Sequence, residues 1–202
     1  MHSPSLRGAT LVTVLIAMLV AACGDPLGLP QAANPNTVDT VRLFALSGTP
    51  VATPSGFRFF RAAIPSVAVP QPVRTDQSSD YDFAFEIDTT GRALLLPTAA
   101  LRLGPSSGGQ LSTLPFDSIR LAPDRNYELD SALVLDVGSV AILQSRLTTC
   151  GFGIGAVYHY YAKLRVLTID LTTDPGGRYI DLEILVDTNC GYRGLELGLP
   201  SR

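Results

Sequence analysis

The sequence predicts an all-β domain over residues 37–202, built as an antiparallel β-sandwich or a barrel-like sheet. Apolar and polar residues alternate with a period of two in many short segments of this region, as strands with one buried face require. Fifteen prolines and eighteen glycines punctuate the chain, which is typical of short strands joined by tight turns. A region of this length buries a sizeable core without a metal.

Eight segments of the chain carry the strand pattern. The first strand is expected to place Val41, Leu43 and Ala45 on one face, and residues 57–61 form a short aromatic strand. Residues 83–87 and 93–96 predict a hairpin around the turn 88–91, where Gly91 allows a positive φ. The remaining strands are expected at residues 133–137, 140–147, 167–171 and 180–186.

The last two of these segments predict a C-terminal hairpin. Leu167, Ile169 and Leu171 are expected to share one face, and residues 173–177 supply a proline- and glycine-containing turn. One face of the second strand is apolar and the other is charged, as in an antiparallel sheet covered on one side. The pattern does not distinguish a sandwich from a barrel.

The first 22 residues have the pattern of a secretion signal. Arg7 and the α-amino group supply positive charge, and an apolar run extends from residue 11 to residue 20. About 15 residues separate Arg7 from Cys23, fewer than the ~20 that a bilayer-spanning helix needs. We therefore expect a cleaved signal rather than a permanent anchor.

The end of this signal, Val20-Ala21-Ala22-Cys23, resembles the lipobox of bacterial lipoprotein precursors. The resemblance implies that residues 1–22 are removed and that Cys23 carries the acyl chains that attach the protein to a lipid bilayer. Several chains on one residue hold a protein stably. A plain secretory signal, with Cys23 as an ordinary thiol, is the alternative.

The resemblance also implies a location in the cell envelope. Gly24 stands where an aspartate favours retention at the inner membrane in enterobacterial lipoproteins, which favours the outer membrane, on its periplasmic or surface face. Residues 23–36 contain three prolines and two glycines and predict a lipidated cysteine followed by a flexible tether. The mature region resembles predicted lipoproteins of GC-rich bacteria, in which arginine largely replaces lysine; Lys163 is the single lysine.

Cys150 and Cys190 remain once Cys23 is acylated. An even pair in an oxidising compartment predicts a disulfide, which would close a loop of about 40 residues around the C-terminal hairpin. A reactive thiol is the alternative, although the sequence has no CxxC motif.

One histidine and its neighbours form the main candidate binding site. Tyr158, His159, Tyr160 and Tyr161 are consecutive, and they either line the mouth of a ligand cavity or form a partly exposed strand. A Ser-His-Asp triad would have to use His159, and no G-x-S-x-G elbow accompanies it.

The acidic residues form two groups in the sequence, one at Asp80, Asp82, Glu86 and Asp88 and one at Asp124, Glu128 and Asp130. Neither has the order of a calcium-binding loop, and alternation predicts that Asp82, Glu86 and Asp88 face solvent. We therefore expect no metal and no cofactor.

The net charge of −3 gives no basic footprint for nucleic acid. The sequence favours a membrane-anchored envelope lipoprotein whose β-domain has a non-enzymatic structural, interaction or binding role, with an envelope protein or a small ligand as partner. A small-ligand-binding barrel and, with less support, a periplasmic hydrolase using carboxylates or His159 are the alternatives.

Overall fold

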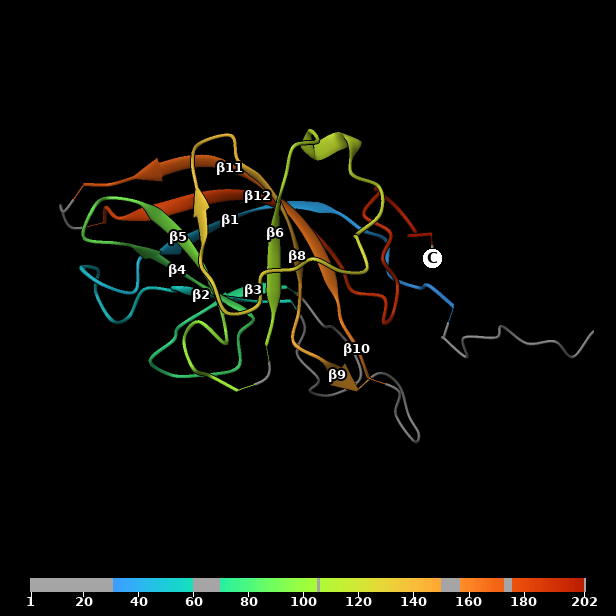
Figure 1. Cartoon of the computed structure of the whole chain (residues 1–202), viewed down its shortest axis with the longest axis horizontal. Coiled ribbons are helices and arrows are strands. Elements are labelled where there is room, and N and C mark those ends of the chain that lie inside the picture. Colours follow the sequence, from blue (N-terminus) through green and yellow to red (C-terminus); the bar gives the residue numbers. More distant parts are fainter. Residues whose placement is uncertain (1–30, 60–69, 105, 150–156, 173–175, 202) are drawn as a thin grey trace, which may run out of the picture. The chain divides into compact units, whose positions relative to one another are not determined.

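The computed structural model describes residues 31–59, 70–104, 106–149, 157–172 and 176–201. In this part of the chain the regular structure is almost entirely β (Figure 1). Two five-stranded sheets and one two-stranded sheet are formed, and every strand pairing is antiparallel. The predicted all-β class is confirmed, and the packing of the two large sheets is that of a sandwich.

Each of the two large sheets is named after one of its inner strands. The β12 sheet contains, in spatial order, β1 (Val38–Phe44), β12 (Tyr179–Asp187), β11 (Tyr161–Asp170), β8 (Val140–Gln144) and β6 (Gly108–Ser112). The β4 sheet contains β3 (Gln71–Val73), β2 (Gly56–Arg58), β4 (Phe83–Ile87), β5 (Ala93–Pro97) and β7 (Leu133–Leu135). β9 (Thr148–Thr149) pairs with β10 (Val157–Tyr158), and the 3₁₀ helix η1 spans Phe116–Ser118.

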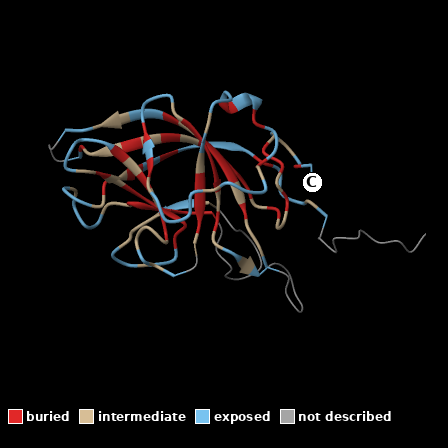
Figure 2. Ribbon diagram, in the orientation of Figure 1, coloured by how far each residue is buried: buried red, intermediate tan, exposed pale blue. Residues whose placement is uncertain are grey.

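The main core lies between the two large sheets. Alternate residues of β4 point inward, with Phe83, Phe85 and Ile87 all buried, and β12 contributes Ile180 and Leu182 to the same core. Buried residues therefore concentrate along the central strands (Figure 2). Burial of large aliphatic and aromatic side chains at about 25 cal/mol per Å² is the main force that holds the sheets together.

Most of the predicted strands are confirmed. The β4–β5 hairpin forms around Gly91, whose φ is +82°, and β11 pairs with β12 as the predicted C-terminal hairpin. Residues 60–61 of the aromatic strand and residues 173–175 of the last turn lie outside the described residues.

The predicted face of the β11 strand is wrong beyond Val166. The pairing register with β12 shifts between Val166 and Thr168, and the extra residue, Leu167, is 40% exposed. A β-bulge interrupts strict alternation, so Ile169 packs against the core while Leu171 is 50% exposed.

A second, smaller core covers the outer face of the β12 sheet. Val140, Ile142 and Leu185 point outward from that sheet and pack against Phe116 and Leu195. The segment that contains η1 and the C-terminal segment thus form an additional layer. As a result β8 is buried on both faces, and a strand buried on both faces reads as a continuous apolar run.

Lys163 links β11 to the segment that contains η1. Its side chain is buried, and Nζ donates hydrogen bonds to the carbonyl oxygens of Phe116 (3.0 Å) and Ile119 (2.9 Å). The ammonium also lies 4.6 Å from the centre of the Phe116 ring, within cation–π range. Burial lowers the pKa of this amine.

The β-domain begins earlier than the predicted residue 37, because one compact unit comprises Ala32–Arg202. The backbone N–H groups of Ala33 and Asn34 each donate to Asn189 Oδ1 at 2.9 Å, and Asn189 Nδ2 donates to the Asn34 carbonyl at 2.7 Å. Asn36 forms an isolated antiparallel bridge with Gly198. Residues 32–36, which we assigned to the tether, are therefore held on the domain.

The signal segment and Cys23 lie outside the described residues. Among the residues that the structure does describe, helices are short, and none combines the length and apolar character needed to span a membrane.

Candidate functional site

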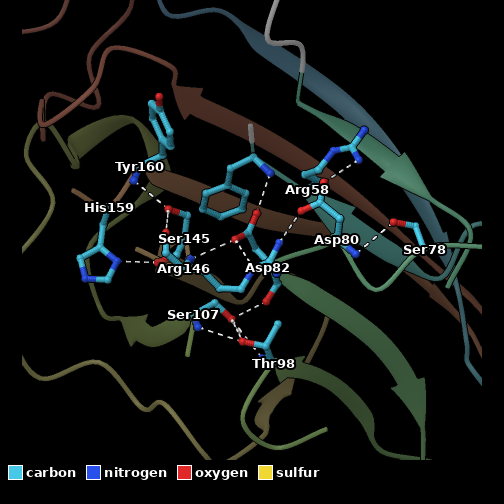
Figure 3. A network of polar contacts seen from close by, with 11 residues as sticks. Arg58, Ser78, Asp80, Asp82, Thr98, Ser107, Ser145, Arg146, His159 and Tyr160 are labelled. Atoms are coloured by element: carbon cyan, nitrogen blue, oxygen red, sulfur yellow. Dashed lines mark hydrogen bonds and ion pairs between the residues drawn. The ribbon is translucent and has the colours of Figure 1, made fainter. Parts of the chain in front are cut away.

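The most developed polar site joins the two large sheets through one buried carboxylate (Figure 3). Asp82 immediately precedes β4 and is 4% exposed. Its Oδ2 accepts a hydrogen bond from the Phe59 N–H (2.9 Å), next to β2, and its Oδ1 accepts one from the Arg146 N–H (3.0 Å), just after β8. Because β2 and β8 belong to different sheets, this carboxylate links the sheets.

The prediction that Asp82 faces solvent is wrong. Glu86 and Asp88 of the same group are half-buried, whereas Asp82 lies in the interior. The physical reason is the position of Asp82 just before Phe83, the first residue of β4. There the carboxylate lies beside the end of β8, and the backbone N–H groups of Phe59 and Arg146 donate to its oxygens. Alternation within one strand does not predict this meeting.

Two arginines surround a second aspartate beside Asp82. Asp80 Oδ2 lies 3.2 Å from an Arg58 guanidinium nitrogen, and Asp80 Oδ1 lies 2.7 Å from Arg146. Arg146 Nε is also 3.5 Å from Asp82 Oδ1. The Arg58 side chain is only 5% exposed. Two positive and two negative charges thus compensate one another, as buried or half-buried ions require.

A reciprocal hydrogen-bond pair extends the network toward β5. The Thr98 N–H donates to Ser107 Oγ (3.1 Å), and the Ser107 N–H donates to Thr98 Oγ1 (3.0 Å). Ser107 Oγ then donates to the carbonyl oxygen of Asp82. Both residues are fully buried, so these bonds satisfy polar groups that would otherwise destabilise the fold.

His159 and Ser145 are adjacent, but not in the arrangement of a catalytic pair. His159 Nδ1 lies 2.5 Å from the carbonyl oxygen of Ser145 and therefore donates to it. The Ser145 hydroxyl instead donates to the Arg146 carbonyl (2.7 Å) and accepts from the Tyr160 N–H (2.8 Å). In this geometry the imidazole orients a strand end and does not contact the serine hydroxyl.

The electrostatics of Asp82 follow from its burial. Desolvation raises the pKa of this carboxyl, while the N–H groups of Phe59 and Arg146 and the Arg146 charge oppose the rise. A perturbed carboxyl in a cleft can mark an active site. Here both oxygens are occupied by the protein's own groups, which makes the carboxylate a cross-link between strands.

The structure separates the four aromatic residues predicted as a binding wall. Tyr160 is buried in the main core, and burial raises its pKa to about 12. Tyr161 packs instead on the second core, with its ring 6.2 Å from that of His159 and 6.3 Å from that of Tyr127. Tyr158 lies half-buried in β10. The set is thus divided between layers, and ligand binding by it stays a prediction.

Cys190 follows β12 and packs, partly buried, against the main core. Cys150 lies outside the described residues, so the predicted Cys150–Cys190 disulfide stays a prediction. In the described part of the chain, no three potential metal ligands among histidine, cysteine and the acidic residues are grouped together.

An open hollow of about 570 Å³ lies elsewhere, beside the β4–β5 turn. Several polar groups that line it are hydrogen-bonded to other groups of the protein. Ser47 Oγ donates to Glu86 Oε1 (2.8 Å). Arg178 donates to the carbonyl oxygens of Ser47 (3.0 Å) and Ile87 (2.7 Å). Asp88 accepts from its own turn. The hollow therefore has little free hydrogen-bonding capacity for a ligand.

Sequence reasoning missed Arg58 and Arg146 entirely. Arg58 lies inside the predicted strand 57–61, and Arg146 lies near the end of the predicted strand 140–147. A charged residue within an otherwise apolar strand segment was the available signal. Comparison with known proteins adds no functional information, because no family model, curated protein or solved structure matches the chain.

Proposed function

We propose that the protein is a membrane-anchored envelope lipoprotein whose β-sandwich has a non-enzymatic structural or interaction role. The observation that carries the proposal is Cys23, placed after an apolar run and two alanines. Acyl chains on this cysteine would attach the domain to a bilayer, and the outer membrane is the favoured location because Gly24 follows the cysteine.

The polar network supports a non-enzymatic role. The polar side chains of the network already make hydrogen bonds within the protein. They are the Ser145 hydroxyl, the Asp82 carboxylate and the hydroxyl groups of Thr98 and Ser107. A nucleophile must be in hydrogen-bond reach of its base, and His159 contacts a backbone carbonyl instead. These groups stabilise the junction of the sheets.

Metabolic labelling with a palmitate analogue tests the proposal in the organism that produces the protein. The wild-type protein should be labelled and should partition with membranes, and Cys23→Ala should lose both properties. Cys190→Ser is the matched control, because it removes a cysteine and keeps Cys23, so its labelling should equal that of the wild type. Labelling that persists in Cys23→Ala would refute lipidation at this residue.

We also propose that Cys150 and Cys190 form a disulfide in the exported protein. Cys190 lies partly buried against the main core just after β12, and Thr149, the neighbour of Cys150, ends β9. Peptide mapping without reduction should recover one linked peptide that contains both cysteines. Recovery of two alkylated thiols from the exported protein would disprove the pairing.

A further inference from the structure

We infer that the end of the sandwich where residues 32–36 join the domain faces the lipid bilayer and inserts leucine side chains into its surface. This inference rests on the proposed lipidation of Cys23. We call this region the anchor end and define it by residues 32–36, 120–122 and 189–199. Figure 1 shows the start of β1 and the C-terminus at the same end of the molecule.

The anchor end is tied together by backbone pairing. The Ala32 N–H donates to the Tyr192 hydroxyl oxygen at 3.0 Å, and Asn36 and Gly198 exchange two backbone hydrogen bonds of 2.7 and 3.1 Å. Nearby, the Leu195 N–H donates to the Arg120 carbonyl at 2.7 Å. The segment around residue 120 and the C-terminal segment therefore meet where the chain joins the domain.

The length of chain before Ala32 keeps this end close to the bilayer. Ala32 is the ninth residue after Cys23, and a segment of this length spans at most about 32 Å when fully extended and about 17 Å on average when flexible. A domain of this length is about 40 Å across. The anchor end is thus the part of the domain that the lipid holds nearest to the membrane.

This end carries exposed leucines beside the attachment point. Leu197 and Leu199 flank Gly198, the residue paired with Asn36, and they are 69% and 61% exposed. Leu121, which forms a bridge with Gly194, is 47% exposed. Large apolar side chains grouped on a surface mark a site of contact with a membrane or a partner.

The charges at the anchor end suit a bilayer surface. Arg120 is exposed beside Leu121, and an arginine at an interface can place its stem among apolar groups and its guanidinium at lipid phosphates. Glu196 Oε1 accepts hydrogen bonds from the Ser201 backbone N–H (2.9 Å) and hydroxyl (2.5 Å), and Glu196 Oε2 is buried. We therefore assign the bilayer that holds the acyl chains as the occupant of this surface.

The absence of tryptophan from the sequence allows a direct test with the full-length lipidated protein. Leu197→Trp and Val51→Trp each introduce a single fluorophore at an exposed apolar position, 69% and 72% exposed respectively. Val51 follows β1, whose far end, Phe44, is opposite the end that joins residue 36. Val51→Trp is therefore the matched control.

Both variants are reconstituted into vesicles of phosphatidylethanolamine and phosphatidylglycerol, with and without brominated acyl chains. Bromine quenching of Leu197→Trp should exceed that of Val51→Trp by about threefold, with a blue-shifted emission. Leu199→Trp provides a second reporter should Leu197→Trp fold poorly by circular dichroism. Equal quenching at both ends, or stronger quenching at Val51→Trp, would overturn the orientation.

Flotation of the same vesicles separates the two proposals. Protein that floats with the lipid while its anchor-end tryptophan stays unquenched supports lipidation and overturns the membrane-facing surface. Protein that does not float refutes the anchor, and the orientation fails with it.

Discussion

The stability of the domain should fall between pH 4 and pH 7 because of one buried carboxyl group. Asp187, at the end of β12, is fully buried, and desolvation raises its pKa from 3.8 to about 6. Its Oδ1 accepts from the Asn189 backbone N–H and side-chain amide, both at 2.8 Å, and these bonds partly oppose the rise. Its Oδ2 has no hydrogen-bond partner.

The direction of this pH dependence follows from comparing the pKa of Asp187 in the folded and unfolded states. The unfolded chain loses this proton near pH 4, whereas the folded chain retains it to about pH 6. The contribution to stability is complete below pH 4 and is lost as the pH rises through 6. A difference of about two pKa units corresponds to about 3 kcal/mol.

Asp187→Asn isolates the contribution of this carboxyl to the pH dependence of stability, since the amide oxygen retains the hydrogen bonds to Asn189 without a charge. Urea unfolding at pH 4 and pH 7 should show that the stability of the variant relative to the wild type increases by about 3 kcal/mol between these pH values. Asp88→Asn is the control, because this carboxyl titrates below the window tested. Backbone N–H groups of its own turn lower the pKa of Asp88, so the stability of that variant relative to the wild type should change little between pH 4 and pH 7. A relative stability of Asp187→Asn that does not change with pH would refute the reasoning.

Three further substitutions test other parts of the fold. Lys163→Met should destabilise the domain by about 2 kcal/mol in urea unfolding, because it removes the two hydrogen bonds that Nζ donates to the carbonyl groups of Phe116 and Ile119; unchanged stability would show that Lys163 does not hold η1 in place. Gly91→Ala should cost about 1 kcal/mol through its positive φ alone, since no atom lies within 4 Å of the added Cβ, and a loss above 3 kcal/mol would contradict this. Cys190→Ser should lower stability by about 4 kcal/mol if a loop of about 40 residues is closed through Cys150, whereas no change in the unfolding midpoint would argue against the disulfide.

The sequence was sufficient to predict the strands that belong to local hairpins. Phe83, Phe85 and Ile87 alternate with more polar residues, and Gly91 marks the turn, so β4 and β5 were expected where they occur. These features depend on residues close together in the chain. The two-sheet arrangement depends on which strands meet across the core, and no local pattern contains that information.

The candidate site was largely beyond sequence reasoning for the same reason. Asp82 and Arg146 are far apart in the chain, and only the packing of β4 against the end of β8 makes one the partner of the other. Tyr160 and Tyr161 were predicted to act together, yet neighbouring strand residues point to opposite faces, and here those faces belong to different cores. The bulge at Leu167 was invisible because the apolar pattern continues through it.

The edges of the sheets bear on how the domain would behave under the proposed lipid anchoring. Anchoring would raise the local concentration, and exposed strand edges would then favour association between copies. β3, an edge of the β4 sheet, has only three residues and contains Pro72, which has no N–H to offer. β6, an edge of the β12 sheet, is bridged at Gly109 by Glu128, through hydrogen bonds of 2.8 and 3.0 Å. A side chain at Gly108 would collide with Leu129, 2.6 Å from the position of its Cβ, so glycine there allows the segment around Glu128 to cover this edge. The short, proline-containing edge at β3 and the covered edge at β6 fit a domain whose contacts are made by side chains, as the leucines of the anchor end would make them.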